Sequence, residues 1–147
     1  MTCKHLLVGL LLVACLIAPL PLAGQTQGKL SDSQRWTVVV ESDDLTAFID
    51  NESVTTVPVD VTEIWVLFEY AKPEGTGGKK FDATLSHWQL KCAERHMKPT
   101  QAQFYLRTKQ IHSEALYEDW ESPAPGSVNE AVFRRGCAMS ASTRSGP

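Results

Sequence analysis

Two cysteines in the second half of the chain, Cys92 and Cys137, constrain the fold more than any other feature. The other two cysteines, Cys3 and Cys15, lie in an N-terminal stretch whose sequence is typical of an export signal. An even pair that remains after export into an oxidising compartment is most simply a disulfide. We therefore predict a Cys92–Cys137 bridge that ties a C-terminal helix to a β-sheet.

The first 24 residues have the layout of a secretory signal peptide. The basic residue Lys4 precedes an uncharged apolar run, LLVGLLLVACLIAPLPLAG, that ends in small residues. Two prolines in this run, Pro19 and Pro21, disfavour an uncleaved membrane helix. The segment LVAC also resembles a bacterial lipobox, so lipid anchoring at Cys15 is an alternative, although the residues after it are apolar where a polar tether is expected. We predict a signal peptide over residues 1–24 and a polar tether over 25–34.

Composition limits the mature chain to one domain. About 123 residues remain after cleavage, which is enough for a single core. Loss of the signal peptide removes one basic side chain, so the formal charge of the chain changes from −3 to −4. This acidic balance gives no reason to expect nucleic acid as a partner. We predict one domain over residues 35–137 and a small, polar, disordered tail over 138–147.

Alternation of apolar and polar residues predicts a β-rich domain. Residues 36–41 and 45–50 alternate with a period of two. Residues 57–70 are the most β-prone segment, and the apolar run at its centre, Ile64–Phe68, indicates a strand that is covered on both faces. Further strands are predicted at 84–95 and, after a break at Lys98-Pro99, at 102–107 and 111–117. Along 84–95 one face of the strand carries Trp88, Leu90 and Cys92, and the other carries Gln89, Lys91 and Arg95.

Turn and capping residues predict the connections and one helix. The glycine-rich segment 72–80 lacks the elements of a phosphate-binding loop, which favours a plain hairpin loop. Ser127 and Glu130 form a capping box, so a helix should begin there and continue to about Arg135. Gly136 is then expected to end it. The result is an α+β domain in which an antiparallel sheet carries a C-terminal α-helix on one face.

Catalytic and metal sites find little support. His87, Cys92, His96 and Cys137 are residue types that bind zinc, but Cys92 and His96 would lie about 13 Å apart on one extended strand. His87 would also face away from Cys92. No GxSxG motif is present. Glu63 with Glu69, or Glu118 with Glu121, would be candidate carboxylate pairs for glycoside hydrolysis, but such residues more often form a solvated face. We therefore predict no metal, no cofactor and no enzymatic activity.

The face of the sheet opposite the helix is the sharpest functional clue. One short helix covers only one face, so Trp65 and Leu67 on the central strand need loops, a second protomer or a partner over them. Basic residues on a loop and on an outward strand face are further candidate contacts. The candidate partner-binding residues are Trp65, Leu67, Lys79, Lys80, Lys91 and Arg95.

Several motifs, in order, resemble the bacterial surface-adhesin protein E family. They are Trp36, FIDNESV from Phe48, WVLFEYAKP from Trp65, LKCAER from Leu90, PGSV from Pro125, and Cys137. The resemblance covers residues 34–137. It implies a six-stranded antiparallel β-sheet with a C-terminal helix packed against it and held by a disulfide. It also implies export to the bacterial envelope, since the namesake of the family is an adhesin that binds host extracellular-matrix and plasma proteins.

The resulting functional prediction is an exported, non-enzymatic binding or adhesion protein of a Gram-negative bacterium, in the periplasm or at the cell surface. Protein partners, including extracellular-matrix proteins, follow from the resemblance, and a homodimer is a further arrangement. The alternative is a periplasmic structural or assembly factor with no host ligand.

Overall fold

The computed structural model describes residues 29–31, 33–57, 60–76 and 78–144. The predicted signal peptide, the first part of the tether and the last three residues lie outside these ranges. The described elements are β1 (Trp36–Glu41), β2 (Leu45–Asp50), β3 (Thr55–Val57), β4 (Val61–Thr76), β5 (Lys79–Lys91), β6 (His96–Leu106), β7 (Lys109–Ala115) and α1 (Val128–Arg144). No helix in these ranges is long and apolar enough to cross a membrane.

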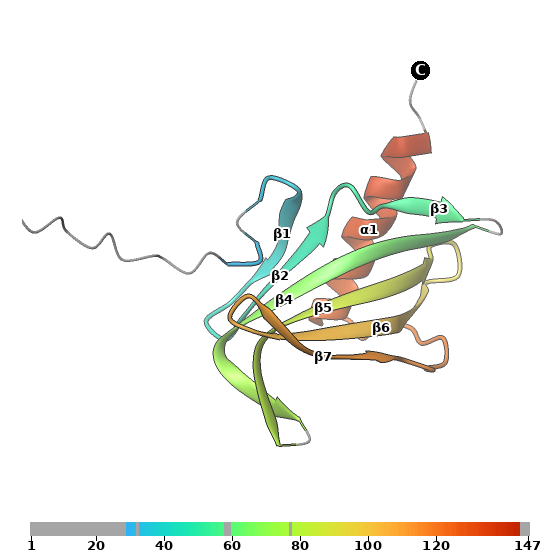
Figure 1. Cartoon of the computed structure of the whole chain (residues 1–147). Coiled ribbons are helices and arrows are strands. Elements are labelled where there is room, and N and C mark those ends of the chain that lie inside the picture. Colours follow the sequence, from blue (N-terminus) through green and yellow to red (C-terminus); the bar gives the residue numbers. More distant parts are fainter. Residues whose placement is uncertain (1–28, 32, 58–59, 77, 145–147) are drawn as a thin grey trace, which may run out of the picture.

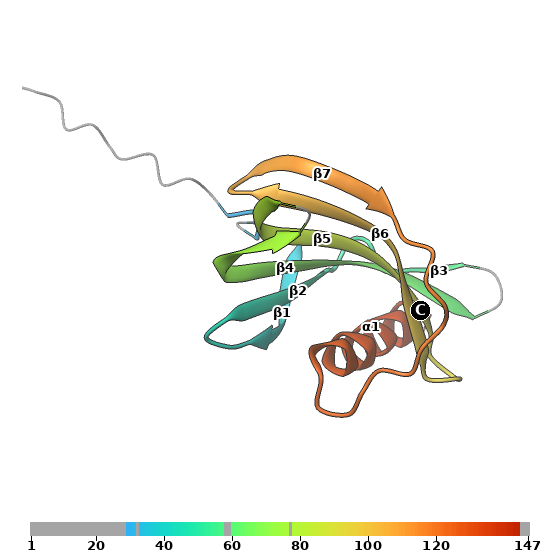
Figure 2. The same cartoon turned by 90° about the horizontal axis from the view of Figure 1, so that it is seen from below.

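The strands form one antiparallel sheet with α1 against one face (Figure 1). The strand order is β1-β2-β4-β5-β6-β7, and the short β3 pairs with β4 outside this path. Figure 2 shows the sheet curving around one side of the helix. The predicted α+β architecture is therefore confirmed, with β3 as the one strand that the sequence did not indicate.

Several strand ends differ from the prediction. Most of the segment 72–80 is strand, because β4 continues to Thr76 and β5 begins at Lys79. Between them Gly78 has a φ of +77°, a conformation that glycine adopts without a steric cost. Strand β6 begins at His96 and includes Pro99, where we expected a break. Pro99 lies beside an irregularity in the β5–β6 pairing, and such irregularities tolerate a residue without an N–H group.

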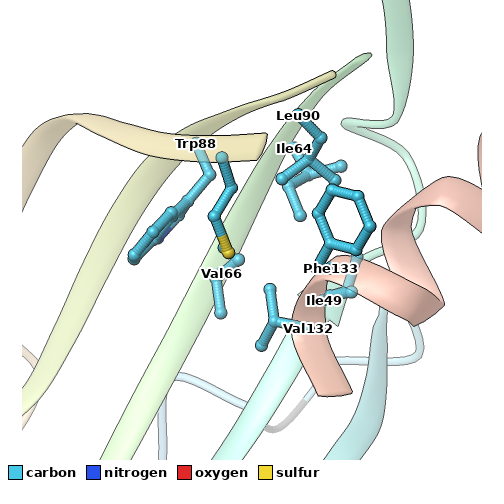
Figure 3. Close-up of a cluster of buried hydrophobic side chains, with 8 residues drawn as sticks. Ile49, Ile64, Val66, Trp88, Leu90, Val132 and Phe133 are labelled. Carbon is cyan, nitrogen blue, oxygen red and sulfur yellow. The ribbon is translucent and has the colours of Figure 1, made fainter. Parts of the chain in front are cut away.

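The core lies between the sheet and the helix (Figure 3). Side chains alternate along a strand, so Ile64 and Val66 of β4 point to the same face. The neighbouring strand β5 adds Trp88 and Leu90 to this face, as its alternation predicted. Helix α1 contributes Val132 and Phe133, both buried, and it is this apolar contact that holds the helix on the sheet.

Helix α1 begins where the capping residues predicted. The Ser127 hydroxyl accepts a hydrogen bond from the backbone N–H of Glu130 at 3.1 Å, and the Glu130 carboxylate accepts one from the N–H of Gly126 at 2.8 Å. The predicted end at Gly136 is wrong, because the helix continues to Arg144. Residues 138–144, which we expected to be disordered, form its last turns.

The Cys92–Cys137 disulfide is confirmed. It joins the turn after β5 to the middle of α1, and the two Cα atoms are 5.7 Å apart. Because both sulfurs are in the disulfide, neither is a thiolate that would bind a metal ion. One turn further along the helix, the buried Ser140 hydroxyl lies 2.9 Å from the hydroxyls of both Thr56 and Thr62. The helix is thus fastened to the sheet by apolar contacts, a disulfide and a buried hydroxyl cluster.

Candidate functional site

The helix-free face, defined by Glu63, Trp65, His87 and Gln89, lies on the side of the sheet opposite α1. These residues alternate along β4 and β5 with core residues that face the helix. Trp65 and His87 are direct neighbours across the two strands, and their ring centroids lie 5.0 Å apart. Both side chains are only partly buried, so this face presents an aromatic surface with polar groups beside it.

Hydrogen bonds connect the polar groups of the helix-free face across three strands. Gln89 donates its amide N–H to Glu63 at 2.9 Å, and His87 Nε2 lies 3.9 Å from the same carboxylate. The other ring nitrogen of His87 lies 2.7 Å from the Thr100 hydroxyl on β6. Burial lowers the pKa of His87 below its usual 6.5, and the nearby Glu63 carboxylate partly opposes this shift. Sequence reasoning missed this network, since the strand register that joins its members is not visible in the alternation pattern.

Leu67 is not accessible to a binding partner in the folded single chain. It belongs to the same side of β4 as Trp65, but its side chain is fully buried. In the register of the sheet it lies between Phe48 of β2 and Leu85 of β5, whose side chains are themselves half-buried. Leu67 is therefore already buried within the single chain, and Trp65 is the accessible member of the predicted pair.

The predicted basic contacts fall in two separate places. Lys79 and Lys80 are exposed at the start of β5, in the hairpin that β4 and β5 form. Lys91 lies at the other end of β5, 3.3 Å from Glu94 and 4.8 Å from the centre of the Trp120 ring. Arg95 is not on a strand face as predicted, but in the turn between β5 and β6. Its guanidinium lies 3.5 Å from Glu130 of the helix.

A cavity of about 210 Å³ lies where β4, β5 and the β6–β7 turn meet the N-terminal segment. Its two carboxylates are already engaged, because Glu69 accepts the Ser31 N–H at 3.2 Å and Asp82 accepts the Arg107 N–H at 2.8 Å. Burial raises the pKa of the Tyr70 phenol, so this group is a weaker acid than an ordinary tyrosine. The lining residues are Lys29, Leu30, Glu69, Tyr70, Asp82, Ala83 and Arg107.

The histidines and acidic residues do not assemble into a metal site in the described ranges. No group of three or more His, Cys, Asp or Glu side chains there is placed to hold a metal ion. Cys92 and His96, which we expected on one strand, stand on either side of the β5–β6 turn. The observed surface features are therefore an aromatic and polar sheet face and an exposed basic hairpin.

These features define a class of protein: a disulfide-tethered module of one antiparallel sheet and one helix, with its candidate contacts on the surface. The family model of surface-adhesin protein E matches residues 36–138, and the chain belongs to that family. The match confirms the resemblance seen in the sequence motifs. No curated protein and no solved structure matches the chain. The protein is therefore surface-adhesin-like, and its family suggests an exported protein with protein partners and no catalytic role.

Proposed function

We propose that this protein is exported to the envelope of a Gram-negative bacterium and reaches the cell surface, where it binds protein partners such as those of the extracellular matrix. The observation that carries the proposal is membership of the surface-adhesin protein E family over almost the whole described fold. The disulfide supports export, because such bonds persist in oxidising compartments. The N-terminal sequence, with the features of a signal peptide, supports it as well.

The helix-free face is the proposed contact surface. Half-buried tryptophans contribute strongly to binding when a partner removes their remaining surface from water. Trp65 has this exposure, and its neighbour His87 holds its ring on one side. Gln89 and Glu63 supply hydrogen-bonding groups beside it. Lys91 lies further along β5, where it would contribute at the rim of such an interface. Arg95 is directed toward Glu130 of α1 and lies outside this surface.

Surface labelling of intact cells with a membrane-impermeant reagent tests the location. An adhesin must be labelled, whereas a periplasmic assembly factor is labelled only after the outer membrane is opened. Absence of labelling on intact cells would exclude the adhesin function and leave the periplasmic role.

Binding of the purified protein to immobilised matrix proteins tests the contact surface. Trp65→Ala should weaken binding by about tenfold or more, the usual effect of removing a central aromatic contact. Tyr117→Ala is the matched control, because this aromatic residue is 96% exposed and lies on the loop after β7. Unfolding curves for both variants verify that they are folded. Equal affinities of a folded Trp65→Ala variant and the wild type would remove Trp65 from the interface.

A further inference from the structure

The hairpin of β4 and β5 extends beyond the rest of the sheet and forms an arm, defined here as residues 71–76 and 78–81 (Figure 1). The pairing of the two strands is irregular between Glu69 and Glu74. Beyond this point β4 pairs only with β5, through Glu74 with Phe81 and Thr76 with Lys79. The arm is thus a two-stranded element, and its described residues 71–75 and 78–80 are exposed.

Aromatic contacts fix the base of the arm to the body. Phe81 is buried, and its ring lies 5.6 Å from that of Tyr70 and 5.0 Å from that of Phe104 on β6. Next to it, both carboxylate oxygens of Asp82 accept the backbone N–H of Arg107, at 2.8 and 2.9 Å. The turn between β6 and β7 is therefore held against the base of the arm.

Positive charge is concentrated on these two hairpins. Residues 71–80 of the arm contain three lysines and one glutamate, although the chain as a whole has a net charge of −3. Within the described ranges no ion pair joins any of the five exposed basic residues to a carboxylate, whereas Arg35, Lys91 and Arg95 are all paired. The five residues are Lys72, Lys79 and Lys80 on the arm and Arg107 and Lys109 at the β6–β7 turn.

The distance between these positive charges indicates which kind of anion they would bind. Strand residues rise by about 3.3 Å each, so Lys79 lies about 10 Å along β5 from Asp82, where the Arg107 turn is held. Cations this far apart do not converge on one phosphate, but they suit the repeated charges of an extended polymer. A lipid surface fits less well, because Phe81, the one aromatic residue in the sequence of the arm, is packed at its base, where it is not available for insertion.

We propose that the arm and the β6–β7 turn bind a sulfated polysaccharide chain of the heparin class. This inference rests on the proposed function, since it names the chemistry that Lys79 and Lys80 recognise on a host surface. Each contact is between exposed charges and is weak, so affinity comes from several contacts along the chain and falls with added salt.

Chromatography of the disulfide-bonded protein on immobilised heparin tests this proposal. The wild type should be retained at low salt and eluted as the salt concentration rises. Lys79→Gln/Lys80→Gln should weaken binding to a heparin oligosaccharide by about tenfold, the sum expected for two exposed charge contacts. Arg107→Gln/Lys109→Gln should weaken it similarly, and Lys79→Arg/Lys80→Arg should preserve it.

The matched control is Arg134→Gln/Arg135→Gln, which removes an adjacent exposed basic pair from α1 and changes the net charge equally. Equal weakening by the control and by the arm variant would reduce the effect to net charge and overturn the proposal. No retention of the wild type, or binding to anionic phospholipid vesicles without binding to heparin, would also overturn it. Heparin binding by a protein that intact-cell labelling places inside the cell would contradict the proposed function but not this inference.

Discussion

At the scale of single residues, His87 shows how the sheet sets the charge of a side chain. Its ring is held between Trp65, with centroids 5.0 Å apart, and the Thr100 hydroxyl, 2.7 Å from Nδ1. Burial at this position disfavours the imidazolium and lowers its pKa from 6.5, while Glu63 opposes the shift. The folded protein therefore prefers His87 neutral more strongly than the unfolded chain does.

This preference predicts a loss of stability in mild acid. Because the pKa of His87 is lower in the folded than in the unfolded state, its stabilising contribution is complete above pH 6.5. It is lost as the pH falls from 6.5 toward the lower folded pKa, since only the unfolded chain then binds the proton. His87→Gln should make the urea midpoint less sensitive to pH in this window. His112→Gln at the edge strand is the control, and identical pH profiles for the His87 variant and the wild type would contradict the prediction.

The strands around His87 show what the alternation of apolar and polar residues can predict about a sheet. It placed Trp88 and Leu90 on one face of the strand and Gln89 on the other, because side-chain direction follows from a local period of two. In the fold, Trp88 and Leu90 are buried. The alternation did not pair Gln89 with Glu63, or His87 with Thr100. Those pairs depend on strand register, which is set by turns and by the irregularity beside Pro99. Local patterns therefore predicted the fold better than they predicted the candidate site.

At the scale of elements, α1 continues past a glycine that the sequence alone would place at its end, because packing against the sheet favours the longer helix. Glycine is common just after the end of a helix, so Gly136 suggested an end. In the fold, Gly136 lies close to the sheet, and an added Cβ would lie 2.7 Å from Leu90 Cδ1 and 3.1 Å from Ile64 Cδ1. The small polar residues after it continue the helix, and Ser140 joins the buried hydroxyl cluster. Contacts with residues distant in sequence, absent from any local pattern, explain the difference.

The close approach at Gly136 predicts that larger side chains destabilise the fold. Alanine would favour the helix by about 1 kcal/mol in an exposed position, but here its methyl group presses on two fully buried side chains. Overpacking of this kind costs about 1–3 kcal/mol, so Gly136→Ala should be neutral to destabilising and Gly136→Val destabilising by about 2 kcal/mol or more. Urea denaturation measures both. Arg134→Val, on the exposed side of the same helix, should change stability by only about 0.5 kcal/mol, and an equal loss in the two valine variants would contradict the packing argument.

At the scale of the whole molecule, the disulfide links the sheet and the helix across 45 residues of sequence. This span includes β6, β7 and the loop before α1, so the bond restricts about a third of the unfolded chain. A loop of this length is expected to contribute about 4 kcal/mol, compared with a total stability of about 5–15 kcal/mol for a typical domain. The fold therefore depends on the compartment in which the bond forms.

Removal of the bond should accordingly lower the stability of the helix and the sheet together. Cys92→Ser/Cys137→Ser, or reduction of the wild type, should decrease the free energy of unfolding by about 4 kcal/mol. The core is shared, with Phe133 of α1 packed beside Leu90 of β5, so both elements should still unfold in one transition. Tryptophan fluorescence, to which the buried Trp88 contributes, reports the sheet, and far-ultraviolet circular dichroism reports the helix. Their midpoints should coincide. Equal urea midpoints for the oxidised and reduced protein would mean that packing alone holds the helix on the sheet. Separate transitions in the two signals would mean that the helix detaches from a sheet that is stable without it.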